Sequence, residues 1–331
     1  MTQSAASQKP EAYFSEGAEK LSRALREIEK TILGQRGVIE NTLVTLACGG
    51  HVLLIGVPGL AKTLLVETTA TVLGLSTNRI QCTPDLMPAD ILGSEVLEDS
   101  GDKKRSFRFI KGPVFTQLLM ADEINRASPR TQSALLQAMQ ERTVSTGGTT
   151  RPLPDPFHVL ATQNPIEQEG TYPLPEAQLD RFLMQVDVTY PDSEAERAIY
   201  LATTTGTPDK PEPVMTPADL LNIQQLVRAL PIGEQVVTAI LALVRRARPS
   251  EADAPDIVQK YVSWAPGPRA GQALMLACRA KALLEGRTAP SVDDVVALAV
   301  PVLQHRMALT YKAKSDGMDK TRLIRTLAES L

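Results

Sequence analysis

One glycine, one lysine and one threonine occur at a spacing that suits phosphate binding. Gly56 follows the apolar run of residues 52–55, and Lys62 and Thr63 open an amphipathic helical segment. In such a loop, backbone N–H groups surround phosphate oxygens, the lysine reaches the β- and γ-phosphates, and the threonine hydroxyl binds Mg²⁺. The segment therefore predicts a P-loop that binds a nucleoside triphosphate. An ordinary strand–turn–helix crossover is the alternative.

Position 61 departs from the P-loop pattern G-x-x-x-x-G-K-[ST], because the chain has Ala61 where the pattern has glycine. We expect Ala61 to fit with a negative φ, since only a positive φ strongly favours glycine. Gly59 adds flexibility nearby. The nucleotide-binding residues predicted in this loop are Gly56, Val57, Pro58, Gly59, Leu60, Ala61, Lys62, Thr63 and Leu64.

Two carboxylates, Asp122 and Glu123, end a second apolar run that begins at Gln117. Buried parallel strands expose their carboxyl ends at the edge of the sheet where ligands bind. An aspartate there can hold Mg²⁺, and the adjacent glutamate can orient and deprotonate an attacking water. By itself the pattern also fits a solvated strand end. After a P-loop it predicts a hydrolytic site.

A third apolar run, residues 158–162, ends in Gln163 and Asn164. An asparagine at this strand end can hydrogen-bond the attacking water or the γ-phosphate. The alternative is an asparagine that closes a turn before Pro165. We therefore count Asn164 among the candidate catalytic residues.

Composition and charge restrict the class of protein. The 331 residues suffice for about two domains, and 43% hydrophobic with 22% charged residues is ordinary for a soluble globular chain. The net charge of −3 argues against bulk attraction to nucleic acid. No apolar run is long enough to span a membrane, and the polar N-terminus lacks an export signal, so we expect a cytoplasmic protein. The three cysteines and three histidines show no metal-ligand spacing.

Alternation of apolar strands and helical segments as far as residue 188 predicts an α/β fold with a three-layer parallel sheet. Helical periodicity begins at Ser15, after a polar segment that we expect to be disordered. Residues 203–217 have a linker composition, and every periodic segment beyond them is helical. We therefore divide the chain into a tail (1–14), a nucleotide-binding core (15–205) and an all-α lid domain (206–331).

Two hairpins interrupt this alternation. Residues 94–97 and 106–110 form the arms of the first, which carries Lys103, Lys104 and Arg105 in an otherwise acidic chain. Residues 143–153 form the second, around a Gly-Gly turn.

Taken together, these motifs resemble the MoxR family of AAA+ ATPases. The resemblance is carried by Gly56 to Thr63, by Asp122-Glu123-Ile124-Asn125-Arg126, and by the segment from Asn164 to Phe182, NPIEQEGTYPLPEAQLDRF. The last segment is long and specific to the family, and the resemblance extends from about residue 20 to 310. It implies an AAA+ P-loop core with an all-α lid, and it makes Ala61 a tolerated variant.

The resemblance also implies a role for individual residues. Lys62 and Thr63 would bind phosphate and Mg²⁺, Asp122 would support the metal, Glu123 would activate water, and Asn164 would be sensor 1. The cofactors implied are ATP/ADP and Mg²⁺. The segment Leu33-Gly34-Gln35 matches the place where such proteins contact adenine.

Two arginines complete the implied site. Arg181 resembles the arginine finger, which would reach the γ-phosphate of a neighbouring subunit; a salt bridge to Asp180 or Glu176 is the alternative. Arg269 resembles sensor 2, although the chain reads Ala-Pro-Gly-Pro-Arg where the family has Gly-Ala-Ser-Pro-Arg. For Arg269, action in cis, action in trans and an ordinary surface position all stay open.

The function implied is an ATP-hydrolysing, chaperone-like homo-oligomeric ring, expected to be a hexamer, that remodels, assembles or activates a client protein complex. A protein with a von Willebrand factor A-type domain is the expected partner, and insertion of a metal cofactor is one expected task. The two hairpins would contact the client; solvated hairpins are the alternative. A nucleic-acid motor or clamp related to minichromosome-maintenance helicases is a second candidate, disfavoured by 4% aromatic residues. Intact Lys62, Asp122 and Glu123 disfavour a nucleotide switch without hydrolysis.

Overall fold

A five-stranded parallel sheet forms the centre of the structure, a computed structural model that describes residues 10–99, 105–167, 169–204 and 210–331. The strands lie in the order β2 (Thr77–Gln81), β5 (Leu118–Asp122), β8 (His158–Gln163), β1 (Val52–Ile55) and β9 (Met184–Asp187). Every neighbouring pair is parallel, which confirms the predicted sheet. The carboxyl ends of β1, β5 and β8 therefore meet at one edge.

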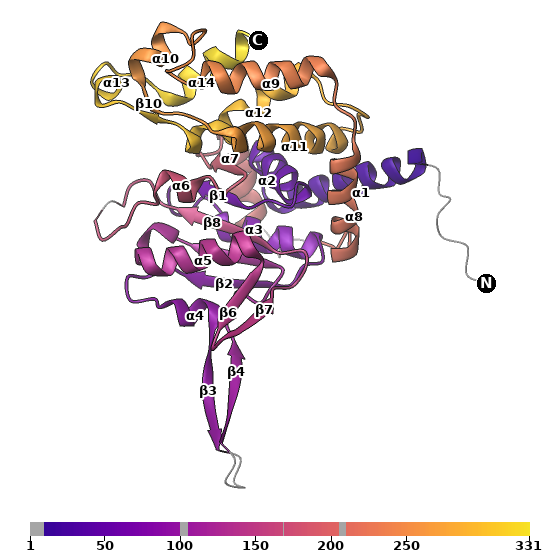
Figure 1. Cartoon of the computed structure of the whole chain (residues 1–331). Helices are drawn as coiled ribbons and strands as arrows, with labels where there is room; N and C mark the ends of the chain where they lie inside the picture. The colour runs from indigo at the N-terminus through magenta and orange to yellow at the C-terminus, as the bar shows by residue number, and fades with distance from the viewer. Residues whose placement is uncertain (1–9, 100–104, 168, 205–209) are drawn as a thin grey trace, which may run out of the picture.

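Helices cover both faces of this sheet (Figure 1). They are α1 (Pro10–Thr31), α2 (Arg36–Ala47), α3 (Lys62–Val72), α4 (Pro88–Leu92), α5 (Pro129–Glu141), α6 (Glu176–Leu179) and α7 (Ser193–Thr204). Alternate strand residues point to opposite faces. In β1, Leu54 joins a large core with α1, α2 and α3, whereas Leu53 joins a smaller core with α4 and α5. Burial on both faces explains why these strands read as continuous apolar runs.

The first helix begins earlier than the sequence predicts. Residues 10–14 were expected in a disordered tail, but α1 begins at Pro10, and Phe14 packs against the large core. Proline suits the first turn of a helix, because the N–H that it lacks would have no partner there. Residues 1–9 of the expected tail lie outside the described residues.

The C-terminal part is a lid that packs on one side of the sheet (Figure 1). Its helices are α8 (Pro217–Ala229), α9 (Glu234–Arg246), α10 (Asp256–Tyr261), α11 (Pro268–Leu284), α12 (Val292–Leu303), α13 (Tyr311–Ser315) and α14 (Lys320–Glu329). The lid is not purely helical, because β10 (Val262–Trp264) and β11 (Ala308–Leu309) form an antiparallel ribbon. Strands of three and two residues are too short to show a period in the sequence.

The lid and the core share one hydrophobic interior, since the large core continues from α1 into α8, α9, α11, α12 and α14. Polar contacts add to it: Lys20 on α1 forms a 2.7 Å ion pair with Asp219 on α8. Among the described residues, no single helix is long and apolar enough to cross a membrane. Only α8 and α9 taken together have the length and composition of a membrane span, and they are bent by 92° relative to one another.

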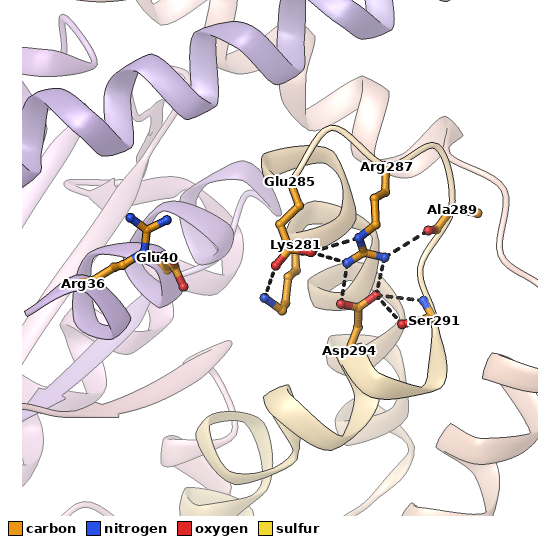
Figure 2. A network of polar contacts seen from close by, with 8 residues as sticks. All are labelled: Arg36, Glu40, Lys281, Glu285, Arg287, Ala289, Ser291 and Asp294. Carbon is orange, nitrogen blue, oxygen red and sulfur yellow. Dashed lines mark hydrogen bonds and ion pairs between the residues drawn. The ribbon is translucent and has the colours of Figure 1, made fainter.

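An ion pair with a buried carboxylate fixes the turn between α11 and α12 (Figure 2). Asp294, 2% exposed, accepts hydrogen bonds from Arg287 at 2.6 and 2.9 Å and from the Ser291 backbone N–H at 2.8 Å. Arg287 also contacts Glu285. Because the buried carboxylate has several donors, burial of its charge is compensated.

Both predicted hairpins are present. The first, β3 (Gly93–Asp99) with β4 (Arg105–Lys111), projects from the core on the side away from the lid (Figure 1). Its predicted client-contacting residues Lys103 and Lys104 lie outside the described residues, as does the side chain of Arg105. The second hairpin, β6 (Thr143–Thr146) with β7 (Thr149–Pro152), lies beside the base of the first.

Candidate functional site

A cavity of about 460 Å³ opens at the carboxyl edge of the sheet. It is lined by residues 58–64 of the loop between β1 and α3, by Asp122 and Glu123, and by Thr162 and Asn164. The structure thus brings the loop, the two carboxylates and the asparagine together, as the sequence predicts. We call this space the P-loop cavity.

Lys62 folds back onto its own loop. Its Nζ donates hydrogen bonds to the carbonyl oxygens of Gly56 at 2.5 Å and Val57 at 2.8 Å. Burial lowers the pKa of Lys62, and the nearby charges of Asp122 and Glu123 oppose this shift. Gly56 is required by a close approach, because a Cβ there would lie 2.6 Å from the Val188 carbonyl oxygen. Phosphate oxygens are stronger acceptors than these carbonyls, so the lysine can exchange them for a bound nucleotide.

The expectation for Ala61 is wrong. Its φ is 56° and its ψ is 23°, which is the left-handed region and not the negative φ that was expected. Ala61 is the N-cap residue of α3, and its carbonyl accepts from the Leu65 N–H at 2.9 Å. An N-cap residue is usually extended, so the left-handed backbone belongs to this particular turn from the loop into α3. A left-handed alanine costs on the order of 1–2 kcal/mol. The loop therefore carries strain that glycine would not have.

Asp122 is held by two side chains. Thr162 Oγ1 donates to Asp122 Oδ1 at 2.5 Å, and Arg79 Nη2 lies 2.5 Å from Asp122 Oδ2. The Thr162 hydroxyl also accepts from the Glu123 backbone N–H at 2.9 Å. Thr162 is a site residue that the sequence analysis missed. The sequence could have pointed to it only as a hydroxyl within the apolar run of β8, the strand that pairs with β5.

Glu123 has an oriented carboxylate. Its backbone is left-handed, with φ of 52°, and its Oε2 accepts from Gln81 Nε2 at 3.0 Å and from Arg126 Nη1 at 3.1 Å. Arg126 therefore faces Glu123 of its own chain. The side chain lines the P-loop cavity, where a carboxylate can accept a proton from water.

Asn164 is 5% exposed and lines the P-loop cavity. Its Oδ1 accepts from the Ile166 backbone N–H at 3.2 Å, the bond of an asparagine turn. Asn164 therefore closes a turn before Pro165, and this turn fixes its side chain at the cavity, where a contact with water or the γ-phosphate stays a prediction.

Thr63 and Asp122 fit a magnesium ion. They bring a hydroxyl and a carboxylate to one cavity, and Mg²⁺ prefers such oxygen ligands. Within the described ranges, no group of three or more His, Cys, Asp or Glu residues could hold a metal. Magnesium is commonly bound through one or two protein ligands together with substrate phosphates, which is the number of ligands that Thr63 and Asp122 offer.

The predicted adenine contact is only partly next to the P-loop. Gln35 Nε2 donates to the Leu60 carbonyl oxygen at 3.4 Å, which ties this segment to the loop. Gly34 and Gln35 line a second cavity of about 460 Å³ between the end of β9 and the lid. Leu33 does not line it. Gly34 has a φ of 71°, and a Cβ there would lie 2.3 Å from Ala195 Cβ.

The two predicted catalytic arginines lie away from the P-loop cavity. Arg181 and Arg269 line a separate cavity of about 400 Å³ between core and lid, which we call the arginine pocket. Arg181 Nε donates to Gln140 Oε1 at 3.0 Å; in the described part of the chain it forms no salt bridge to Asp180 or Glu176. Arg269 Nη1 lies 3.6 Å from Asp180 Oδ2.

Arg228 on α8 is a further arginine of this pocket that the sequence analysis missed. It is exposed, and among the described residues it has no hydrogen-bond or ion-pair partner. Buried Arg306 completes the set of arginines, and Asp180 is the pocket's one acidic residue among those described. The pocket therefore carries excess positive charge and suits an anion.

Comparisons with known proteins agree with this geometry. Residues 51–184 match the family model of the ATPase family associated with various cellular activities (AAA), and residues 254–327 match an AAA lid domain. The chain is 42% identical to Chaperone MoxR1 of Mycobacterium tuberculosis, over 94% of this chain and 81% of that protein. It is 33% identical to Protein MoxR of Paracoccus denitrificans, over 84% and 86%. The chain belongs to the MoxR family of AAA+ ATPases.

A solved structure resembles this MoxR-family ATPase throughout. The crystal structure of a candidate ATPase from Cytophaga hutchinsonii superposes with a TM-score of 0.88 at 37% identity, over 97% of both chains. Recognition of the family, the AAA fold with its lid and ATP hydrolysis as the activity are thus confirmed.

Proposed function

We propose that this chain is the subunit of a homo-oligomeric ring, of hexameric form, in which adjacent subunits share each ATPase site. The observation that carries the proposal is the separation of two half-sites on one chain. The P-loop cavity holds the loop, the carboxylates and Asn164, whereas Arg181 and Arg269 line the arginine pocket. Phosphoryl transfer needs cations at the γ-phosphate. A second subunit that presents its arginine pocket to the first subunit's P-loop would supply them.

Within one half-site each residue has a specific task. Lys62 binds the β- and γ-phosphates after leaving the Gly56 and Val57 carbonyls. Glu123 orients the attacking water and accepts its proton, and Asn164 holds this water or the γ-phosphate. Thr63 and Asp122 would hold Mg²⁺, which neutralises phosphate charge when bound. Residues 33–35 and 56–64 would contact the nucleotide.

In the other half-site, Arg181 stabilises the charge of the transferring phosphoryl group. Arg269 lines the same pocket, and we infer that it acts in trans as well. Arg228 adds a third cation that is not neutralised within the described chain. Trans-acting arginines contribute roughly 10³–10⁵ to the rate in well-studied cases.

The ring would use ATP to remodel, assemble or activate a client protein complex in the cytoplasm. The name of Chaperone MoxR1 supports this chaperone-like task. A von Willebrand factor A-type protein is the proposed partner, with metal-cofactor insertion as one task. The projecting β3–β4 hairpin would contact the client, since Phe107 is 73% and Ile110 is 53% exposed there. A nucleic-acid motor has less support, because the relatives above are MoxR proteins.

Turnover of two variants tests the shared site. Glu123→Gln should bind ATP but lose nearly all hydrolysis, and wild-type turnover per subunit should rise with protein concentration as rings form. Arg181→Ala should also bind without turnover, and mixing the two inactive variants should restore activity. Absence of activity at every mixing ratio, in rings shown by native mass spectrometry to contain both variants, would refute the shared site.

A further inference from the structure

We propose that Arg306 and Asp180 connect the lid to the arginine pocket and position Arg181 and Arg269 for the neighbouring subunit's phosphate. This inference rests on the proposed shared site. Arg306 and Asp180 are positioning residues: they act through the two arginines and do not themselves touch the nucleotide.

Arg306 is a buried cation with an almost complete set of partners. It is 3% exposed and belongs to a short 3₁₀ turn, η2 (Gln304–Arg306), that follows α12. Its Nε donates to Asp180 Oδ1 at 2.7 Å, and Nη2 donates to the Phe182 carbonyl at 2.8 Å. Nη1 donates to the carbonyls of Leu183 at 3.0 Å and Val302 at 2.5 Å. An arginine has five N–H donors in a fixed fork, so its orientation is set by these bonds.

Three of the four partners of Arg306 are close neighbours of Arg181 in the sequence. Asp180 immediately precedes Arg181, and Phe182 and Leu183 immediately follow it. The other two residues of η2 hold the same stretch: His305 Nε2 lies 3.0 Å from the Phe182 carbonyl, and Gln304 Nε2 donates to the Gln185 carbonyl at 2.9 Å. A movement of η2 with the lid therefore displaces the backbone on both sides of Arg181.

Asp180 contacts Arg269 as well as Arg306, so it connects both arginines. Its Oδ1 is taken by Arg306, and its Oδ2 lies 3.6 Å from Arg269 Nη1 at the start of α11. The distance to Arg269 exceeds that of a good charge-assisted hydrogen bond, so Arg269 is restrained but not fully neutralised.

Engagement of Asp180 by Arg306 also leaves Arg181 with a neutral partner. Arg181 contacts Gln140, an amide, so its charge stays available for a phosphate. The buried pair of Arg306 and Asp180 therefore serves two ends: it fixes the backbone around Arg181, and it keeps the carboxylate from pairing with Arg181.

The test is Asp180→Asn, which preserves the shape of the side chain but removes its charge. We expect the KM for ATP to change less than twofold and kcat to fall about tenfold or more, while rings still form. Arg306→Lys keeps the charge and loses the fork, and it should give the same pattern. A matched control is Asp294→Asn, which weakens the ion pair of Asp294 with Arg287 in the lid (Figure 2). Neither residue lines the arginine pocket. It should lower the melting temperature and leave kcat below that temperature unchanged.

Mixing distinguishes positioning from a folding defect. Asp180→Asn keeps its own P-loop half-site, and Glu123→Gln keeps its arginine pocket, so a 1:1 mixture contains competent interfaces at about one position in four. We expect turnover near a quarter of the wild-type value, well above either variant alone. Wild-type kcat in Asp180→Asn, or no recovery where the Arg181→Ala mixture does recover, would overturn the connection. If neither mixture recovers, the shared site itself is wrong and the connection fails with it.

Discussion

Thr162 Oγ1 donates a hydrogen bond to Asp122 Oδ1 at 2.5 Å and accepts one from the Glu123 N–H at 2.9 Å. One hydroxyl at the end of β8 thus holds both carboxylate residues at the end of β5. Because it uses its donor and its acceptor together, neither function can be replaced by an apolar side chain of the same shape. This contact fixes the carboxylate of Asp122, which would support the metal, relative to the backbone of Glu123, which would activate water.

Thr162→Val should therefore lower kcat about tenfold or more with little change in the KM for ATP. Valine leaves the Glu123 N–H without a partner, which costs about 1–3 kcal/mol, and frees Asp122 Oδ1. Thr162→Ser keeps the hydroxyl and should retain most of the activity. Steady-state ATP hydrolysis measures both variants. Equal loss in the serine and valine variants would show that the hydroxyl is not the important group.

Ala61→Gly should retain ATP hydrolysis and raise the free energy of unfolding by up to about 1 kcal/mol. Glycine relieves the strain of φ 56°, and the greater freedom of the unfolded glycine chain offsets part of this gain. A glycine placed in a helix interior should do the opposite: Ala242→Gly in α9 should cost about 1 kcal/mol. Denaturant unfolding gives both values. Destabilisation by Ala61→Gly would contradict the left-handed conformation.

The P-loop cavity was largely predictable because its parts follow local rules. A loop after a strand and polar residues at strand ends meet at one sheet edge whatever the details of packing, so Lys62, Asp122, Glu123 and Asn164 were found from the residues. Thr162 was not found, because its role depends on a contact between two neighbouring strands, β8 and β5, and no motif or spacing in the sequence reveals such a contact. The negative φ predicted for Ala61 was wrong, because the geometry of the turn into α3 outweighs the backbone preference of one residue.

The arginine pocket was much less predictable. Arg181 and Arg269 came from the family resemblance alone, and their partners, Gln140 and Asp180, are set by how the lid packs on the core. Arg228 and Arg306 stood out in no motif. Long-range packing of this kind leaves no periodic signal, which also explains why the β10–β11 ribbon was missed.

Arg228→Ala should lower kcat about tenfold if its charge contributes on the order of 1.4 kcal/mol to the transition state. Its position in the arginine pocket without a described partner is the reason. Arg228→Lys should keep most of the activity, because a lysine retains the charge. Arg322→Ala, which removes an exposed arginine of α14, is the control and should leave kcat unchanged. Recovery on mixing Arg228→Ala with Glu123→Gln would assign the effect to the neighbour's site, and an unchanged kcat would exclude Arg228.

Acidification below pH 6.5 should destabilise the protein before its carboxylates titrate. Burial is the main cause that lowers the pKa of His51 to about 3 and of His158 to about 4. His51 Nδ1 accepts from the Val159 N–H, and His158 Nε2 lies 3.2 Å from Gln224 Nε2 on the lid, so each ring is held neutral. An unfolded histidine has a pKa near 6.5.

Between that value and the folded pKa, the unfolded state therefore binds protons that the folded state does not. The free energy of unfolding must therefore fall as pH falls, by about 1.4 kcal/mol per pH unit for each such histidine. Above pH 7 these histidines are neutral in both states, so they should no longer make the free energy of unfolding depend on pH. Denaturant unfolding at pH values from 7 to 5 measures how steeply the free energy of unfolding changes with pH. His158→Gln should reduce this slope by the contribution of one histidine, about 1.4 kcal/mol per pH unit. A slope that is flat over this range, or unchanged in His158→Gln, would show that the buried ring is not the titrating group.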